Sequence, residues 1–170
     1  MQKQCDYREA VKTKYPEQVV VAIAKDEGGR PNPVTLGWTM IVSGHPPMMA
    51  VAVARGHYSV ETISHSKCFT IAFPSEHMAE AALFYGSNSG RNVDKFAQMP
   101  SQMTDAQKID SVILQDAVAN FECTLESELE VGDHIIFVGK VVASHVSTEP
   151  KKRLYTVGPN HQLGSVDASY

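Results

Sequence analysis

The sequence predicts a mainly β (α+β) fold in which an antiparallel sheet closes, fully or partly, into a barrel with helices at its side. Three observations predict it. Apolar, strand-like segments follow one another through short turns, with helices expected between only some of them. Neither GxGxxG nor GxxxxGKS/T occurs, so a doubly wound nucleotide-binding fold is disfavoured. The 170 residues contain no dividing linker, which predicts one domain over residues 1–170.

The N-terminal third is expected to form strands. Strands are expected at residues 18–25, 36–43 and 48–54. The first is the β-branched run QVVVAIAK, and it ends at a hairpin-type turn, residues 26–29, whose two glycines can adopt positive φ. Asn32-Pro33 is expected to extend that loop. His45-Pro46-Pro47 separates the other two strands, because proline cannot donate to a ladder.

Helices are expected in the middle of the chain, around a fourth strand at residues 68–73. They are expected at Ser59–Ser66, at Ser75–Tyr85 and, as a single turn, at Asn92–Gln98. Ser59 can cap the first helix, because its hydroxyl can accept from an early backbone N–H. Thr104 and Gln107 have the spacing of a capping box, although only a short helical segment follows them.

The last third returns to strands. From Ala119 to Glu126 apolar and polar residues alternate, which predicts a strand whose polar face, including Asn120, Glu122, Thr124 and Glu126, lies in water. A turn at residues 131–133 leads to a returning strand at residues 134–145, expected to pair with the previous one. The tail from Ser147 is rich in proline and glycine and is expected to be irregular.

Charge and composition exclude several classes of function. The net charge of −4 and the pI near 5.9 argue against a general nucleic-acid binder, which needs a basic face. The short basic run at residues 151–153 is expected to be a solvated turn. The N-terminus has no apolar segment of a secretory signal, and no window approaches the length of a membrane span. No nucleic-acid or membrane partner is therefore expected.

The cysteines and histidines predict neither a disulfide framework nor a metal centre. Cys5, Cys68 and Cys123 are far apart, so a reducing, cytoplasmic setting is expected, with the last two buried as small apolar side chains. His65 and Cys68 have H-x-x-C spacing, but no second close pair completes a set of four ligands. No metal site is therefore expected.

Three polar loops at strand ends are the candidate binding segments. They are residues 32–38 (NPVTLGW), 54–59 (ARGHYS) and 86–96 (GSNSGRNVDKF). Glycines let a backbone approach a ligand closely, and successive N–H groups near a helix start bind anions. For each loop alone an ordinary polar connection is the favoured interpretation, and Trp38 could equally be a core residue.

Taken together, in this order, the loops resemble a known family. The patterns N-x-x-T-x-G-W, S-G-R-x-x-D-K-F and G-D-H before an apolar strand are its most specific parts. With VAVARGHYSVETI and FTIAFP between them, the region from Asn32 to Val142 is similar to the flavin reductase-like, FMN-binding split-barrel family and, within it, to flavoredoxin-type proteins. The resemblance implies a six-stranded antiparallel Greek-key barrel, usually a homodimer, with flavin near the subunit interface.

The resemblance also implies roles for individual residues. Contacts along the isoalloxazine ring are implied for Thr35, Trp38, Thr39 and Met40. Contacts around the ribityl and phosphate end are implied for Val53, Ala54, Arg55, Tyr58 and Ser59, and phosphate binding for Ser87, Ser89, Arg91 and Lys95. His134 is implied near the nicotinamide or flavin face, its alternative being a polar turn residue. Phe96 is either a wall against the flavin or a core residue, and we favour the core.

Three functions remain open. The first is an FMN-containing oxidoreductase that uses NAD(P)H or passes electrons to a protein partner. The second is a flavin-binding electron carrier without NAD(P)H turnover, and the third is a flavin-free barrel that serves as an interaction domain. FMN is preferred to FAD on the family subtype. The chain departs from many members at Ala72-Phe73, where they carry valine-asparagine, and its short tail leaves open whether a nicotinamide has its own pocket.

Overall fold

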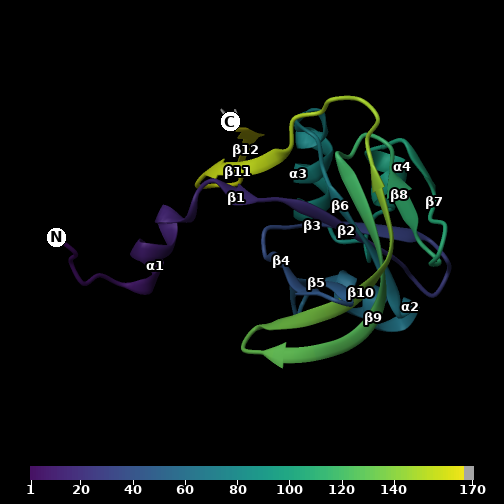
Figure 1. Cartoon of the computed structure of the whole chain (residues 1–170), viewed down its shortest axis with the longest axis horizontal. Helices are drawn as coiled ribbons and strands as arrows, with labels where there is room; N and C mark the ends of the chain where they lie inside the picture. Colours follow the sequence, from purple (N-terminus) through teal and green to yellow (C-terminus); the bar gives the residue numbers. More distant parts are fainter. Residues whose placement is uncertain (167–170) are drawn as a thin grey trace.

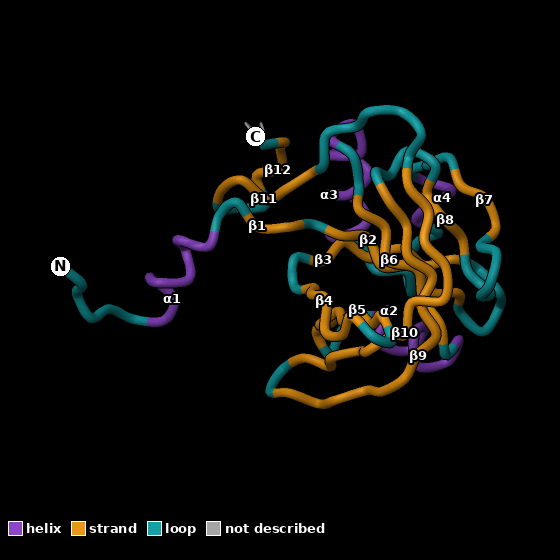
Figure 2. Tube along the Cα trace, in the orientation of Figure 1, coloured by secondary structure: helices purple, strands orange, loops and turns teal. Residues whose placement is uncertain are grey.

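The computed structural model describes residues 1–166, so the last part of the tail, residues 167–170, lies outside the described residues. One antiparallel seven-stranded sheet dominates it, in the order β3-β2-β6-β9-β10-β5-β4. Its strands are β2 Val20–Lys25, β3 Pro31–Leu36, β4 Thr39–Gly44, β5 Pro47–Ala54, β6 Cys68–Phe73, β9 Ala119–Val131 and β10 His134–Val146. The expected mainly β, antiparallel architecture is confirmed, with seven strands in this sheet rather than six (Figures 1 and 2).

The additional strand is β3, which corrects the expectation that Asn32-Pro33 continues a loop. Pro33 pairs with Ile23 and Asn32 with Ala24 in an antiparallel register. Proline is compatible with this strand because β3 is the first strand of the sheet, where its missing N–H interrupts no inner ladder. The next strand, β4, begins at Thr39 rather than at residue 36, so Gly37 and Trp38 connect the two strands.

Smaller elements surround this sheet. A three-stranded sheet has the order β1-β11-β12, with β1 at Glu17–Gln18, β11 at Leu154–Gly158 and β12 at Gln162–Ser165, and a two-stranded sheet pairs β7, Met103–Asp105, with β8, Val112–Leu114. The helices are α1 Tyr7–Ala10, η1 Val11–Lys14, α2 Tyr58–Ser66, η2 Glu76–Met78, α3 Ala79–Ser87 and α4 Lys95–Gln98. The segment that carries α1 extends away from the body, and α1 buries none of its residues (Figure 1).

Two apolar clusters cover the two faces of β2. Val20, Ala22 and Ala24 belong to a cluster with Phe69 and Phe137. Val21 and Ile23 point to the opposite face and pack in a second cluster with Tyr85 and Phe96, among others. This double burial explains why residues 20–24 of β2 are continuously apolar instead of alternating. Phe96 is 8% exposed, which agrees with its expected place in the core.

Three local predictions at helix ends are wrong. The helix α2 begins at Tyr58 with His57 as N-cap, so Ser59 lies inside the first turn and its hydroxyl accepts from the side chain of Asn32. The helical turn α4 begins at Lys95 rather than at residue 92, because the Asp94 carboxylate caps it by accepting from the N–H of Ala97. Thr104 lies in strand β7, where a capping box has no helix to cap.

The polar face of β9 is not solvated at its start, which is a further correction. Asn120 is buried because its side-chain amide exchanges two hydrogen bonds with the backbone of Leu114. Glu122 is fully buried and accepts hydrogen bonds from the N–H groups of Gln107 and Lys108 and from His145. Burial raises the pKa of Glu122, but these hydrogen bonds outweigh it and hold the pKa below its ordinary value.

The tail is ordered into strands where irregular chain was expected. Strand β11 lies between β1 and β12, so the two ends of the chain are joined in one sheet (Figure 1). Arg153, expected in a solvated turn, is half-buried, with its guanidinium 3.7 Å from the centroid of the Phe73 ring. No helix in residues 1–166 combines the length and the apolar character that crossing a bilayer requires.

Candidate functional site

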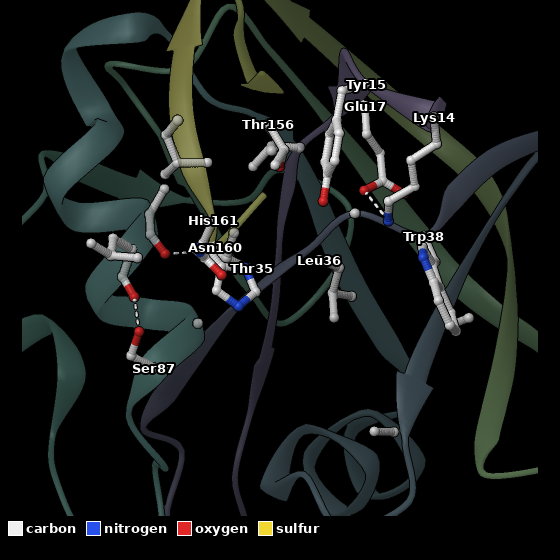
Figure 3. Close-up of a pocket in the computed structure, with 18 of the residues that line it drawn as sticks. Lys14, Tyr15, Glu17, Thr35, Leu36, Trp38, Ser87, Thr156, Asn160 and His161 are labelled. Atoms are coloured by element: carbon white, nitrogen blue, oxygen red, sulfur yellow. Dashed lines mark hydrogen bonds and ion pairs between the residues drawn. The ribbon is translucent and has the colours of Figure 1, made fainter. Parts of the chain in front are cut away.

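A cavity of about 500 Å³ lies where the two ends of the chain meet the main sheet. Its walls come from the N-terminal segment, the β3–β4 connection, the end of β5, α3, the start of β10 and the β11–β12 turn (Figure 3). It is lined by Lys14, Tyr15, Glu17, Val19, Thr35, Leu36, Gly37, Trp38, Ala52, Ala54, His57, Ala82, Leu83, Gly86, Ser87, His134, Thr156, Asn160, His161 and Leu163. This volume falls in the range of about 300–1,000 Å³ that small-molecule sites occupy.

One wall of this main cavity is aromatic. The rings of Trp38 and His134 lie 4.5 Å apart between centroids, and Trp38 is 49% exposed, so it is not a core residue. The Nδ1 atom of His134 is 2.6 Å from the Asp133 carboxylate, and this hydrogen bond lowers the pKa of Asp133. Because Nδ1 is occupied, Nε2 is the nitrogen that His134 has available to a ligand.

The chain ends contribute a polar part of the lining that sequence reasoning missed, with Lys14 and Glu17 beside Trp38 and the β11–β12 turn on the other side (Figure 3). The ammonium of Lys14 pairs with Glu17 at 2.6 Å, and Tyr15 lies between them and the β11–β12 turn (Figure 3). That turn contributes Asn160 and His161, whose φ angles of 59° and 56° are left-handed. The dipeptides Gly158-Pro159 and Pro159-Asn160 are turn signals that could have indicated a hairpin here.

A smaller cavity of about 170 Å³ adjoins the main one, since His57, Gly86 and Ser87 line both. Its remaining lining is Val34, Gly56, Tyr58, Ser59, Asn88, Ser89, Gly90 and Lys95. Hydroxyl, amide and ammonium groups from the second and third predicted loops are thus brought together. The set is rich in hydrogen-bond donors and contains no carboxylate, which is the chemistry of an anion site.

Lys95 is the cation of this smaller cavity. It is 4% exposed, and its Nζ donates to the carbonyl oxygens of Pro33 and Tyr85, both at 2.7 Å. An ammonium has three N–H donors, so one is left for a ligand. Burial lowers the pKa of Lys95 to about 8, so the charge is present at neutral pH.

His57 lies at the junction of the two cavities. Its pKa is lowered by burial first and then by the charges of Lys95 and His134. His57 is therefore a neutral imidazole at neutral pH, with one nitrogen that donates and one that accepts. Sequence reasoning did not select it, although it lies within the second predicted loop.

The backbone of the third loop approaches β3 closely at Gly90. A Cβ atom at this position would lie 2.1 Å from Asn32 Oδ1 and 2.9 Å from the Tyr58 ring. Asn32 is itself buried, donates to the Ser59 hydroxyl at 3.0 Å, and keeps Oδ1 without a partner among the described residues. Only glycine fits at residue 90, and this contact connects the third loop to the residues that position Ser59.

Several predicted site residues lie elsewhere or present different groups. Thr35 lines the main cavity, but its hydroxyl donates to Ala82 O at 2.6 Å. Val53 is fully buried in the core, and Arg55 is exposed and pairs with Glu130 at 2.9 Å. Thr39 and Met40 line a third, largely apolar groove of about 450 Å³ beside Trp38. Arg91 lines neither of the two adjoining cavities, because its guanidinium contacts Glu61 and Gly56 O instead.

The comparisons with known proteins decide the family. The family model described as a flavin reductase like domain matches residues 12–163. The chain belongs to the flavin reductase-like family. A flavin reductase of Pseudomonas putida is 28% identical over 149 residues, which cover 88% of this chain and 84% of the relative.

Solved structures of other flavin-related proteins share the fold. The flavoredoxin of Methanosarcina acetivorans superposes with a TM-score of 0.86 at 23% identity, over 100% of this chain and 94% of that one. An FMN-binding protein of Thermus thermophilus, solved with p-hydroxybenzaldehyde, gives a TM-score of 0.87 at 24% identity over 100% and 98% of the two chains. The split-barrel architecture expected from the resemblance is thereby confirmed. Among residues 1–166, no three His, Cys, Asp or Glu side chains gather as a metal site would require.

Proposed function

We propose that this chain is a single-domain, FMN-dependent oxidoreductase that holds the isoalloxazine ring in the main cavity and the phosphate in the smaller one. The observation that carries the proposal is the junction of a ring-sized cavity with a carboxylate-free cavity lined by Ser59, Ser89 and Lys95. A phosphate carries between one and two negative charges at neutral pH and accepts several hydrogen bonds. The donors and the buried ammonium match that requirement, so the residues present fit FMN.

The residues divide into three groups by position. The ring would lie against Trp38, Ala54 and His134, with backbone groups near Thr35 and Thr39 at its polar edge. The phosphate end would be held by Tyr58, Ser59, Ser87, Ser89 and Lys95, with Arg91 outside them. Val53 would support the site from the core, and Met40 would do so from the neighbouring groove. Arg55 lines neither of the two adjoining cavities and pairs with Glu130, so we propose no direct contact between Arg55 and the flavin.

When bound, FMN would supply a ring that takes up two electrons and releases them singly or as a pair. The chain's own contribution is position and electrostatics. Lys95 offsets the phosphate charge, and neutral His57 hydrogen-bonds at the junction without adding charge. The rings of Trp38 and His134, tilted by 35° to one another, form an aromatic wall, and we propose that His134 Nε2 contacts the reacting partner beside the flavin ring.

We propose NAD(P)H as the electron donor, with which membership of the flavin reductase-like family agrees. The C-terminal hairpin supports this, because Thr156, Asn160 and His161 give the main cavity a polar wall opposite Trp38 (Figure 3). The second candidate is a flavoredoxin-like carrier that exchanges electrons with a protein partner. The fold similarity to a flavoredoxin favours it.

A homodimer is part of the proposal. Strand β4 is the last strand of the main sheet and exposes Met40 at 54%, Ile41 at 75% and Val42 at 40%. Such an apolar edge next to a groove is typical of a surface that a partner covers.

We also propose a cytoplasmic setting, with which the free thiols of Cys5, Cys68 and Cys123 agree.

The test begins with the absorption spectrum of the purified protein. The proposal expects the visible band of oxidised flavin, as isolated or after reconstitution with FMN. A protein that stays colourless after reconstitution overturns both flavin-dependent functions and leaves the interaction-domain alternative. Anaerobic mixing with NADH or NADPH should bleach the band, whereas an unbleached band favours the carrier.

A further inference from the structure

We propose that Arg91 and Glu61 close the outer end of the phosphate cavity, and that the acidic surface beyond them makes the site select FMN over FAD. The inference rests on the proposed function, because it concerns how that flavin site chooses its ligand. FMN ends at its phosphate, whereas the chain of FAD continues through a second phosphate to adenosine. What lies beyond the phosphate cavity therefore decides between them.

Gly56 and Tyr58 line this cavity, and Arg91 lies outside it, in contact with both residues. The guanidinium lies 5.3 Å from the centroid of the Tyr58 ring, close enough for a cation–π contact. Its Nη1 donates to Gly56 O at 3.1 Å, and its Nη2 pairs with the Glu61 carboxylate. Glu61 and Tyr58 both belong to α2, so one helix fixes the ring and the carboxylate that hold Arg91 in place.

The region past Tyr58 is acidic. A further cavity of about 280 Å³ is lined by Tyr58 together with the carboxylates of Asp26, Glu27 and Glu61, and by Gly28, Thr62 and His65. Burial raises the pKa of Asp26, but hydrogen bonds from the backbone and side chain of Arg30 outweigh it and keep the carboxyl ionised. Arg30 is paired to Asp26 at 3.1 Å, so this cation is already engaged.

These features affect the two flavins differently. The phosphate of FMN is terminal, so it can bind Ser59, Ser89 and Lys95 without any group that extends out of the cavity. A pyrophosphate that continues past Tyr58 would meet the Arg91–Glu61 pair and place its second charge beside the carboxylates of the acidic cavity. The second phosphate and the nearby carboxylates carry like charges and would repel each other even when partly solvated, and added salt would screen that repulsion. The structure thus favours a ligand that ends at the first phosphate.

The experiment compares the dissociation constants of FMN, FAD and riboflavin by quenching of flavin fluorescence. In the wild type, FMN should bind at least about tenfold more tightly than FAD, as expected for several weak charge repulsions. Glu61→Gln keeps the shape of the side chain and removes its charge. It should narrow the FAD-to-FMN ratio of dissociation constants by about three- to fivefold, the range of an exposed ion pair. Added salt should narrow the wild-type ratio in the same direction.

The matched control is Glu128→Gln, which also removes an exposed, paired carboxylate. Glu128 pairs at 3.3 Å with Lys67, which is the C-cap of α2. This variant should leave the ratio unchanged. Equal affinities of the wild type for FMN and FAD would overturn this inference but not the proposed function. The same holds if Glu61→Gln and Glu128→Gln change the FAD-to-FMN ratio of dissociation constants by the same factor. Equal affinities for FMN and riboflavin would instead overturn the phosphate cavity itself. Absence of binding by all three flavins would overturn the proposed function and the inference with it.

Discussion

A methyl group added at Gly90 should break the contact between the third loop and β3. The new Cβ would lie 2.1 Å from Asn32 Oδ1 and 2.9 Å from the Tyr58 ring, closer than atoms in real proteins approach. Neither neighbour can move freely, because Asn32 is 3% exposed and Tyr58 is at the start of α2. The loop that carries Ser89 must therefore shift away from the phosphate cavity.

The size of the effect follows from two contributions. Overpacking a filled site costs about 1–3 kcal/mol. Loss of the buried hydrogen bond from Asn32 to Ser59 adds about 1 kcal/mol if the asparagine rotates. We expect Gly90→Ala to lower the free energy of unfolding by about 2–4 kcal/mol. The melting temperature should fall by about 2–4 °C for each kcal/mol lost.

Urea unfolding and FMN titration of the same variant test this reasoning. Gly90→Ala should lose stability and also lose FMN affinity, while its affinity for riboflavin falls less because riboflavin has no phosphate. Gly44→Ala is the control, since a Cβ there meets no atom within 4 Å. Wild-type stability together with wild-type FMN affinity in Gly90→Ala would refute the close approach and its link to the phosphate cavity.

Three further predictions concern buried charges and the aromatic wall. Between about pH 7 and pH 8 FMN affinity should be nearly constant, and above about pH 8 it should fall by up to about tenfold per pH unit. The reason is that free Lys95 loses its proton above a pKa of about 8, whereas the FMN-bound form retains it. The affinity of Lys95→Met for FMN should not show this fall. Glu122→Gln should lower the free energy of unfolding by about 1–3 kcal/mol in urea melts, because a neutral amide replaces a fully buried, triply hydrogen-bonded carboxylate. The pKa of Glu122 is lower in the folded state than its unfolded value of 4.5. Its contribution to the free energy of unfolding should therefore be present above pH 4.5 and be lost as the pH falls toward the folded-state pKa. The same dependence of stability on acidic pH in wild type and Glu122→Gln would contradict this. Trp38→Ala should weaken FMN binding by about tenfold, the value of one aromatic contact, and unchanged quenching titrations would remove Trp38 from the site.

The strands that local patterns describe could be predicted from sequence. Residues 20–24 are continuously apolar because both faces of β2 are buried, and a short β-branched run of this kind between turns predicts a buried strand. Strand β3 could not be found in this way, because its prolines are acceptable only at a sheet edge. Edge position depends on the order of all strands, which no local window contains.

Buried polar groups were the second source of error. Glu122 reads as solvated in a strand that alternates, yet it is fully buried because two N–H groups from a loop fifteen and fourteen residues away, and one histidine, satisfy it. The candidate site shows the same division. The polar loops were found from their own composition, whereas Glu17 and His161 join the site only because the chain ends pair through β1 and β11.

The central claim is that FMN occupies both cavities with its phosphate beside Lys95. A crystal structure of the protein grown with FMN tests it most directly. The account predicts the phosphate within hydrogen-bond distance of Ser59, Ser89 and Lys95 and the ring against Trp38. An FMN molecule bound elsewhere on the chain, or one whose phosphate lies outside the smaller cavity, would contradict it.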